Sequence, residues 1–191
     1  MNGKLYQKNI LSLSLTKNQS LILDILLLLL AGVIISTLRA HLRIPLNIPG
    51  RQGIIVMAIL ISARMLSEQR FASTLAMIGA SAMMVFPFMG FKDPTLPAIY
   101  IAIGLSLDFL WKRLNLNLKS IFIAALFGGL VYMLIPIFRL GLHYFSIYIV
   151  TSFIKHGIVI PIIFHFLFGA IGTLGALGVI KAIKSKKHSA G

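Results

Sequence analysis

The sequence predicts an all-α polytopic membrane protein with six transmembrane helices and both termini in the cytoplasm. Hydrophobic residues make up 58% of the 191 residues and charged residues only 12%, whereas soluble domains carry about 25% charged residues. The apolar residues gather in long runs. The first run, 21–38, contains Asp24 as its one charge, and a helix of about 20 apolar residues can cross a bilayer.

Charged residues and prolines divide the chain into six predicted spans. The first span is followed by Arg39, Arg43 and Pro45, and charge followed by proline is typical of the end of a helix. The polar stretch 64–70 and the proline after Lys92-Asp93 mark further breaks in the same way. The expected spans are 21–38, 53–66, 71–89, 95–111, 119–138 and 157–181.

The distribution of basic residues predicts the orientation of these spans. With six spans, 12 of the 18 Lys and Arg residues lie on the side of the termini and six lie on the other side. Basic loops stay in the cytoplasm, so both termini are predicted to be cytoplasmic. The apolar segment 141–154 is short for a seventh span, and we expect it to be an external interfacial or part-buried segment. The predicted organisation is a cytoplasmic tail (1–20), one six-helix membrane domain (21–181) and a basic cytoplasmic tail (182–191).

Composition also narrows the possible functions. The chain has no cysteine, which excludes thiolate metal sites and disulfides. Its basic residues lie at span ends, where they meet lipid headgroups, so we expect contact with the bilayer and no nucleic-acid partner. The sequence contains no P-loop, H-E-x-x-H or G-x-S-x-G motif. We therefore expect no catalytic residue, metal or cofactor, and any ATPase must be a separate protein.

The four acidic residues are all expected at span ends. Asp108 and Lys112 are four residues apart on one helix, which predicts an ion pair on the protein surface. With Asp24, Glu68 and Asp93 also near span ends, no pair of carboxylates is expected inside the membrane. This weakens an enzymatic interpretation.

A stripe of small residues runs along the third span. Ala72, Ala76 and Ala80 recur at every fourth position, and such stripes let two helices approach closely in a membrane. The stripe serves either helix packing within this chain or docking of a partner protein.

Several short motifs between residues 49 and 110 follow one another in a familiar order. They are a Pro-containing external loop, the helix start Gln52-Gly53, the span end Ser62-Ala63-Arg64, the helix end Val85-Phe86-Pro87-Phe88, and Asp93-Pro94-Thr95 before the next span. This order resembles the substrate-binding S components of energy-coupling-factor (ECF) vitamin transporters, most nearly the biotin-uptake BioY type.

The resemblance implies a protein of the bacterial or archaeal cytoplasmic membrane that captures a vitamin or related small organic solute. It also implies a transmembrane coupling subunit and two ATPases as partners. BioY-like chains carry an Asp-x-x-Lys element near the last helix, and here Ser152 stands at the acidic position before Lys155. The Gly-Gly-Tyr sequence expected after Thr95 is also missing. The resemblance therefore extends to the group and not to its biotin specificity.

Three polar-tipped rings are expected at a similar depth below the external surface. Tyr100, Tyr132 and His165 each lie about two turns from the external end of a predicted span. An aromatic cavity with few polar groups suits a small molecule, and a net basic rim above it favours an anion. The candidate substrate-binding residues are Arg39, Arg43, Asn47, Gln52, Asp93, Tyr100, Tyr132, Lys155 and His165.

Each of these residues also has a simpler explanation. The tyrosines fit an aromatic belt at the membrane interface, and Arg39 and Arg43 fit lipid-phosphate anchors. His165 fits a hydrogen bond to a neighbouring helix as well as a ligand. Three functions remain open at this point: solute capture for a transporter, catalysis on phosphorylated lipids, and a structural membrane subunit.

Overall fold

A computed structural model describes residues 16–42, 48–113, 121–145 and 157–189, with the side chains of the last range described as far as residue 183. Within these ranges the chain is all-α, as predicted. The elements are α1 (Lys17–His41), α2 (Gly53–Leu66), α3 (Ala72–Met84), the short 3-10 helix η1 (Pro87–Met89), α4 (Leu96–Arg113), α5 (Ile121–Tyr144) and α7 (Val159–Ser189).

The helix boundaries differ from the predicted ones where local chemistry was overlooked. α1 begins before residue 21, because the hydroxyl of Thr16 accepts from Gln19 N and the Gln19 side chain accepts from Thr16 N, forming a capping box. α3 ends at Met84, and Pro87 starts η1. α7 continues through Ser189, into the stretch predicted as a tail.

The segment predicted to be interfacial, 141–154, is divided by the structure. α5 does not end near residue 138 but continues to Tyr144, so the first four residues of the segment belong to that helix. Phe145 follows in a turn, and residues 146–154 lie outside the described residues. The expectation for that remainder stays a prediction.

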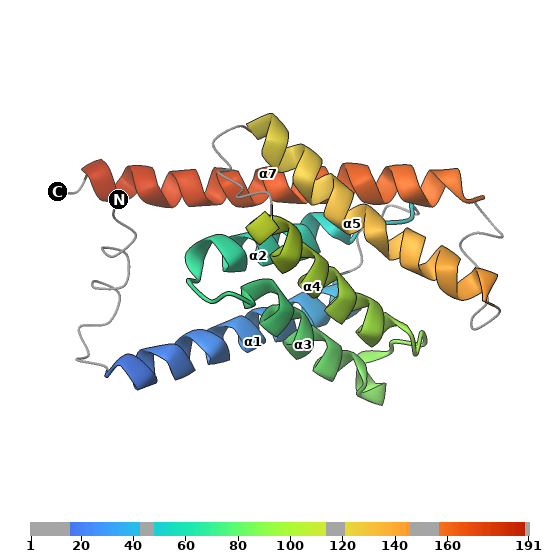
Figure 1. Ribbon diagram of the computed structural model, residues 1–191, viewed down its shortest axis with the longest axis horizontal. Coiled ribbons are helices and arrows are strands. Elements are labelled where there is room, and N and C mark those ends of the chain that lie inside the picture. The colour runs from blue at the N-terminus through green and yellow to red at the C-terminus, as the bar shows by residue number, and fades with distance from the viewer. Residues whose placement is uncertain (1–15, 43–47, 114–120, 146–156, 190–191) are drawn as a thin grey trace.

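The helices run back and forth between two ends of the molecule (Figure 1). α1, α3 and α5 begin at the end that we call the Asp108 end, and α2, α4 and α7 finish there. We call the opposite end the Arg39 end, because α1 finishes there with Arg39 in its last turn. The start of α1 and the end of α7 therefore lie toward the same side of the bundle (left in Figure 1).

Small residues allow α1 and α3 to pack backbone against backbone. A Cβ atom added to Gly32 would lie 1.7 Å from the carbonyl oxygen of Ala76, so only glycine fits there. Ala72, Ala76 and Ala80 are all fully buried, at 0% exposure. Of the two roles open for this stripe, the structure shows packing within the chain, with Ala76 and Ala80 facing α1.

Three of the helices are long and apolar enough to cross a membrane, namely α1, α5 and α7 as far as Ile183. α2 and α3 are shorter apolar helices, of 14 and 13 residues. The outward surfaces of the long helices carry large apolar side chains, such as Leu26 and Leu30 on α1, which are 56% and 51% exposed. Apolar surface on this scale is unusual in a soluble monomer and fits contact with lipid.

Candidate solute-binding site

A cavity of about 180 Å³ lies at the Arg39 end, where three helices and the segment before α2 meet. α1 supplies one wall, α5 and α7 supply the others, and residues 48–52 complete it. The volume is below the 300–1,000 Å³ typical of drug-sized ligands, so the cavity suits a small solute or one end of a larger one. Its polar lining consists of Arg39, Arg51, Gln52, Tyr132, Arg139 and His165.

Arg39 is held in place by aromatic side chains. Its Nη1 donates a hydrogen bond to the hydroxyl of Tyr100, and its guanidinium carbon lies 5.1 Å from the centre of that ring and 5.8 Å from the Phe91 ring. Both distances are in the range of cation–π contacts. These neighbours orient the guanidinium without neutralising its charge, so Arg39 keeps a full positive charge at the cavity wall.

Arg139 lines the same cavity and has an acidic partner. Its Nη2 lies 2.5 Å from Asp93 Oδ2, while Asp93 Oδ1 accepts from both the backbone N and the hydroxyl of Thr95. The carboxylate therefore links the start of α4 to α5. Arg139 Nε is buried and has no hydrogen-bond partner among the described residues, which leaves one donor of this guanidinium unused.

His165 and Tyr132 form a stacked pair between α5 and α7. Their ring centres are 5.3 Å apart with the planes inclined by 25°, and His165 is buried at 8% exposure. His165 Nδ1 lies 2.6 Å from the carbonyl oxygen of Pro161, one turn earlier on α7. A carbonyl can only accept, so Nδ1 carries the proton. The imidazole is thus fixed in both position and tautomer.

Residues 48–52, before α2, pack against this pair. Gly50 has a φ of +83°, which favours glycine, and a Cβ atom there would lie 2.8 Å from His165 Nδ1. Gln52 follows at the N-cap of α2. Its Nε2 donates to the Leu42 carbonyl at 3.4 Å, and its Oε1 is buried without a hydrogen-bond partner in the described part of the chain.

The structure brings four of the predicted binding residues to one cavity, namely Arg39, Gln52, Tyr132 and His165. Two others lie behind it: Tyr100 is fully buried and contacts Arg39, and Asp93 pairs with Arg139. Tyr100 was expected to line the cavity and instead positions a residue that does. The remaining three predicted residues, Arg43, Asn47 and Lys155, lie outside the described residues.

Sequence reasoning missed Arg139 as a member of the site. It lies seven residues after Tyr132, and two turns of helix return a side chain to the same face. Ile135, between them on that face, also lines the cavity. The seven-residue spacing from a candidate ring to a basic residue was the signal that would have identified it.

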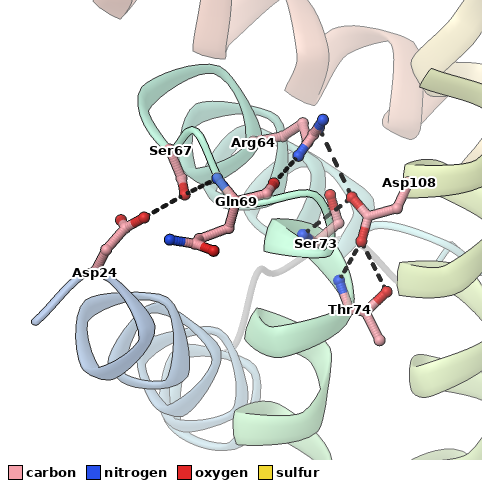
Figure 2. A network of polar contacts seen from close by, with 7 residues as sticks. All are labelled: Asp24, Arg64, Ser67, Gln69, Ser73, Thr74 and Asp108. Carbon is pink, nitrogen blue, oxygen red and sulfur yellow. Dashed lines mark hydrogen bonds and ion pairs between the residues drawn. The ribbon is translucent and has the colours of Figure 1, made fainter. Parts of the chain in front are cut away.

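A second polar cluster lies at the Asp108 end and corrects one prediction (Figure 2). Asp108 does not form a surface ion pair with Lys112, because it is buried at 3% exposure. Its Oδ2 accepts from Thr74 N at 2.8 Å and from the Thr74 hydroxyl at 2.7 Å, while its Oδ1 accepts from Ser73 N at 3.2 Å. Asp108 on α4 thus caps the first turn of α3.

Arg64 extends this cluster to the loop between α2 and α3. Its Nε lies 3.7 Å from Asp108 Oδ1, and its Nη1 donates to the Gln69 carbonyl. Gln69 N donates to the Ser67 hydroxyl, which donates to Asp24 Oδ2 at 2.8 Å. Figure 2 shows that the chain of contacts joins α1, α2, α3 and α4. We interpret this cluster as structural.

No protein-family model, curated protein or solved structure matches this chain. Its function is therefore inferred from the chemistry of its own residues.

Proposed function

We propose that this protein is embedded in a membrane through six spans and captures a small organic anion at the cavity of the Arg39 end. With cytoplasmic termini, that end faces outward. The resemblance of residues 49–110 to ECF S components suggests that the solute is a vitamin or a related compound. In that case, a coupling subunit and two ATPases supply the energy, since the sequence has no nucleotide-binding motif of its own.

The observation that carries this proposal is the charge around the cavity. Arg39 and Arg139 line it, and Asp93, which pairs with Arg139, is the one acid in an ion pair at this end within the described residues. Both arginines are half-buried, and a cation partly removed from water without an acidic partner is unfavourable. An anionic ligand supplies the missing charge, and guanidinium groups suit carboxylates because they donate two parallel hydrogen bonds.

The rings and the bundle around them favour binding over catalysis. Tyr132 and His165 stack on each other, and His165 Nδ1 is committed to the Pro161 carbonyl. The described residues that line the cavity include no carboxylate, so His165 has no acidic partner there to activate it as a nucleophile or a base. The polar groups instead fit the recognition of a bound solute.

The first experiment measures binding of carboxylate vitamins and their precursors to the purified protein in lipid nanodiscs. Each acid is compared with its methyl ester, which has nearly the same shape without the charge. We expect an acid to bind and its ester to bind at least tenfold more weakly. Arg39→Gln should raise the Kd of that acid roughly thirtyfold, or about 2 kcal/mol, because the lost contact is charged and partly buried.

Lys112→Gln is the matched control, because it removes the same charge from an exposed residue at the Asp108 end. It should leave the Kd unchanged. Equal binding of acid and ester, or equal effects of Arg39→Gln and Lys112→Gln, would contradict capture of an anion at this cavity.

The second experiment tests the six-span topology. Single cysteines replace Lys92, between η1 and α4, and Lys181, in the last helix, and both positions are exposed. The chain has no native cysteine, so labelling by a membrane-impermeant maleimide in intact cells reports each position directly. We expect Lys92→Cys to be labelled from outside and Lys181→Cys only after lysis. Labelling of both from the same side would exclude this topology.

The ECF assignment is tested by purification from the native membrane. A transmembrane coupling subunit and two ATPases should co-purify with the protein. If the protein binds its solute but purifies alone under mild conditions, the capture function stands and the ECF assignment is wrong.

A further inference from the structure

Two side chains that line the cavity, those of Gln52 and His165, each carry a hydrogen-bond acceptor, whereas the arginines that line it can only donate. The first is Gln52 Oε1. The Leu42 carbonyl can only accept a hydrogen bond, so the amide atom of Gln52 that faces it must be the nitrogen. Gln52 Nε2 indeed lies 3.4 Å from the Leu42 carbonyl oxygen. The oxygen is therefore the other amide atom, and it is buried without a donor in the described ranges. Leaving a buried acceptor unpaired is unfavourable.

The second acceptor is His165 Nε2. Since Nδ1 donates to the Pro161 carbonyl, Nε2 of the neutral imidazole presents a lone pair. The stacking on Tyr132 and the close approach of Gly50 fix the ring. Both Gln52 and His165 line the cavity, and Gly50 and Gln52 belong to the same short segment beside the ring.

We propose that Gln52 Oε1 and His165 Nε2 form a hydrogen-bond-accepting subsite, so that the solute is a small carboxylate that also carries at least one N–H or O–H donor. This inference rests on the proposed capture of an anion at the same cavity. The arginines bind the carboxylate end, and the two acceptors select the other end. A site with committed acceptors discriminates strongly against analogues that lack the donor, because the acceptors are then left unpaired.

The experiment uses two pairs of acids that differ only in the donor. Succinamate and levulinate share a chain and a carbonyl, but the amide NH₂ of the first is a methyl group in the second. Lactate and isobutyrate differ by a hydroxyl in place of a methyl group. Calorimetric titration of the protein in nanodiscs gives the ratio of the two Kd values for each pair. We expect the donor-bearing acid to bind on the order of tenfold more tightly in at least one pair.

Two variants connect this ratio to the proposed subsite. Gln52→Met has a similar length without the acceptor, and His165→Phe keeps an aromatic ring for the contact with Tyr132. Each should move the ratio toward one. Lys112→Gln, at the other end of the molecule, should leave both the ratio and the individual Kd values as in wild type.

The outcomes separate this inference from the proposed function. If all four acids bind and the members of each pair have equal Kd values, the accepting subsite is wrong while capture of an anion stands. If a donor preference is present but both variants keep it, the subsite is also wrong. If none of the four acids binds, the accepting subsite is wrong as proposed, because lactate and succinamate carry both groups that it requires. Capture of an anion is then decided by the carboxylate vitamins and their methyl esters.

Discussion

The two ends of this bundle contain similar residues and use them in opposite ways. At the Asp108 end, the carboxylate of Asp108 takes three hydrogen bonds and one ion pair from Ser73, Thr74 and Arg64. At the Arg39 end, Arg39 and Arg139 line a cavity, and Asp93 pairs with Arg139. Each end keeps two buried polar atoms without a hydrogen-bond partner in the described residues, Arg64 Nε and Ser73 Oγ at the first and Gln52 Oε1 and Arg139 Nε at the second. The ends differ in their geometry, because Asp108 is surrounded by donors of its own chain, whereas the guanidinium groups of the Arg39 end line a cavity. The difference teaches that open space beside the charged groups, and not the presence of charge, separates a structural cluster from a candidate site.

The largest expected effect comes from breaking the cluster at the Asp108 end. Asp108→Ala leaves Arg64 without its buried partner and uncaps the first turn of α3, so it should destabilise the protein by about 3–5 kcal/mol. Asp108→Asn keeps one accepting oxygen and should cost less. Equilibrium unfolding in mixed micelles measures both. Lys112→Ala, on the exposed side of the same helix end, is the control, and an Asp108→Ala protein as stable as this control would show that the cluster is not structural.

The contact between α1 and α3 gives a stability effect that depends on packing alone, with no charged residue involved. Ala76 is fully buried against Gly32, so Ala76→Leu should cost about 1–3 kcal/mol through overpacking. The same substitution at Ala98, which is exposed on α4, should leave stability close to wild type. If the two variants are equally stable, α1 and α3 do not pack backbone against backbone.

The smallest expected effect is on ligand binding at the Arg39 end. Asp93→Asn releases Arg139 from its only acidic partner in the described residues, and it should tighten binding of a carboxylate by up to about 1 kcal/mol. Added salt should reduce that gain, because the pair is partly exposed. Titrations at low and high salt measure it. Glu68→Gln removes an exposed acid at the other end, and an equal gain from it would show that only net charge matters.

The sequence predicted the helices well because hydrophobic runs and helix breakers are local signals. All six predicted spans correspond to α-helices in the described residues. The errors lie at the ends, where tertiary contacts and caps decide. α5 continues past Arg139 to Tyr144. The predicted end of this span relied on a single charged residue, but one arginine does not end a helix.

The fate of Asp108 shows why some contacts escape sequence reasoning. The four-residue spacing to Lys112 satisfies the rule for a helical ion pair, and that rule treats the helix as isolated. In the folded chain, the backbone N–H groups at the start of α3 donate to the Asp108 carboxylate in place of Lys112. These N–H groups are buried and have no water to bind, so they need an acceptor from the protein. The partner of Asp108 is 34 residues away in the sequence.

The candidate site was predictable in part for a geometric reason. Counting helix turns from the predicted external ends of the spans placed Tyr132 and His165 at one level, and they stack in the structure. Depth alone carries no information about direction around a helix axis. Tyr100 was therefore predicted to line the cavity, but it contacts Arg39 instead. Arg139, which does line the cavity, was not predicted.

The cap that Asp108 provides for α3 has a consequence for the order of assembly during synthesis. α3 has only 13 residues, and its first N–H groups are satisfied by a side chain that emerges 34 residues later. Unpaired backbone groups are expensive in lipid. We therefore expect α3 to remain at the edge of the translocation channel until α4 has been made, so that the two helices enter the membrane as a hairpin.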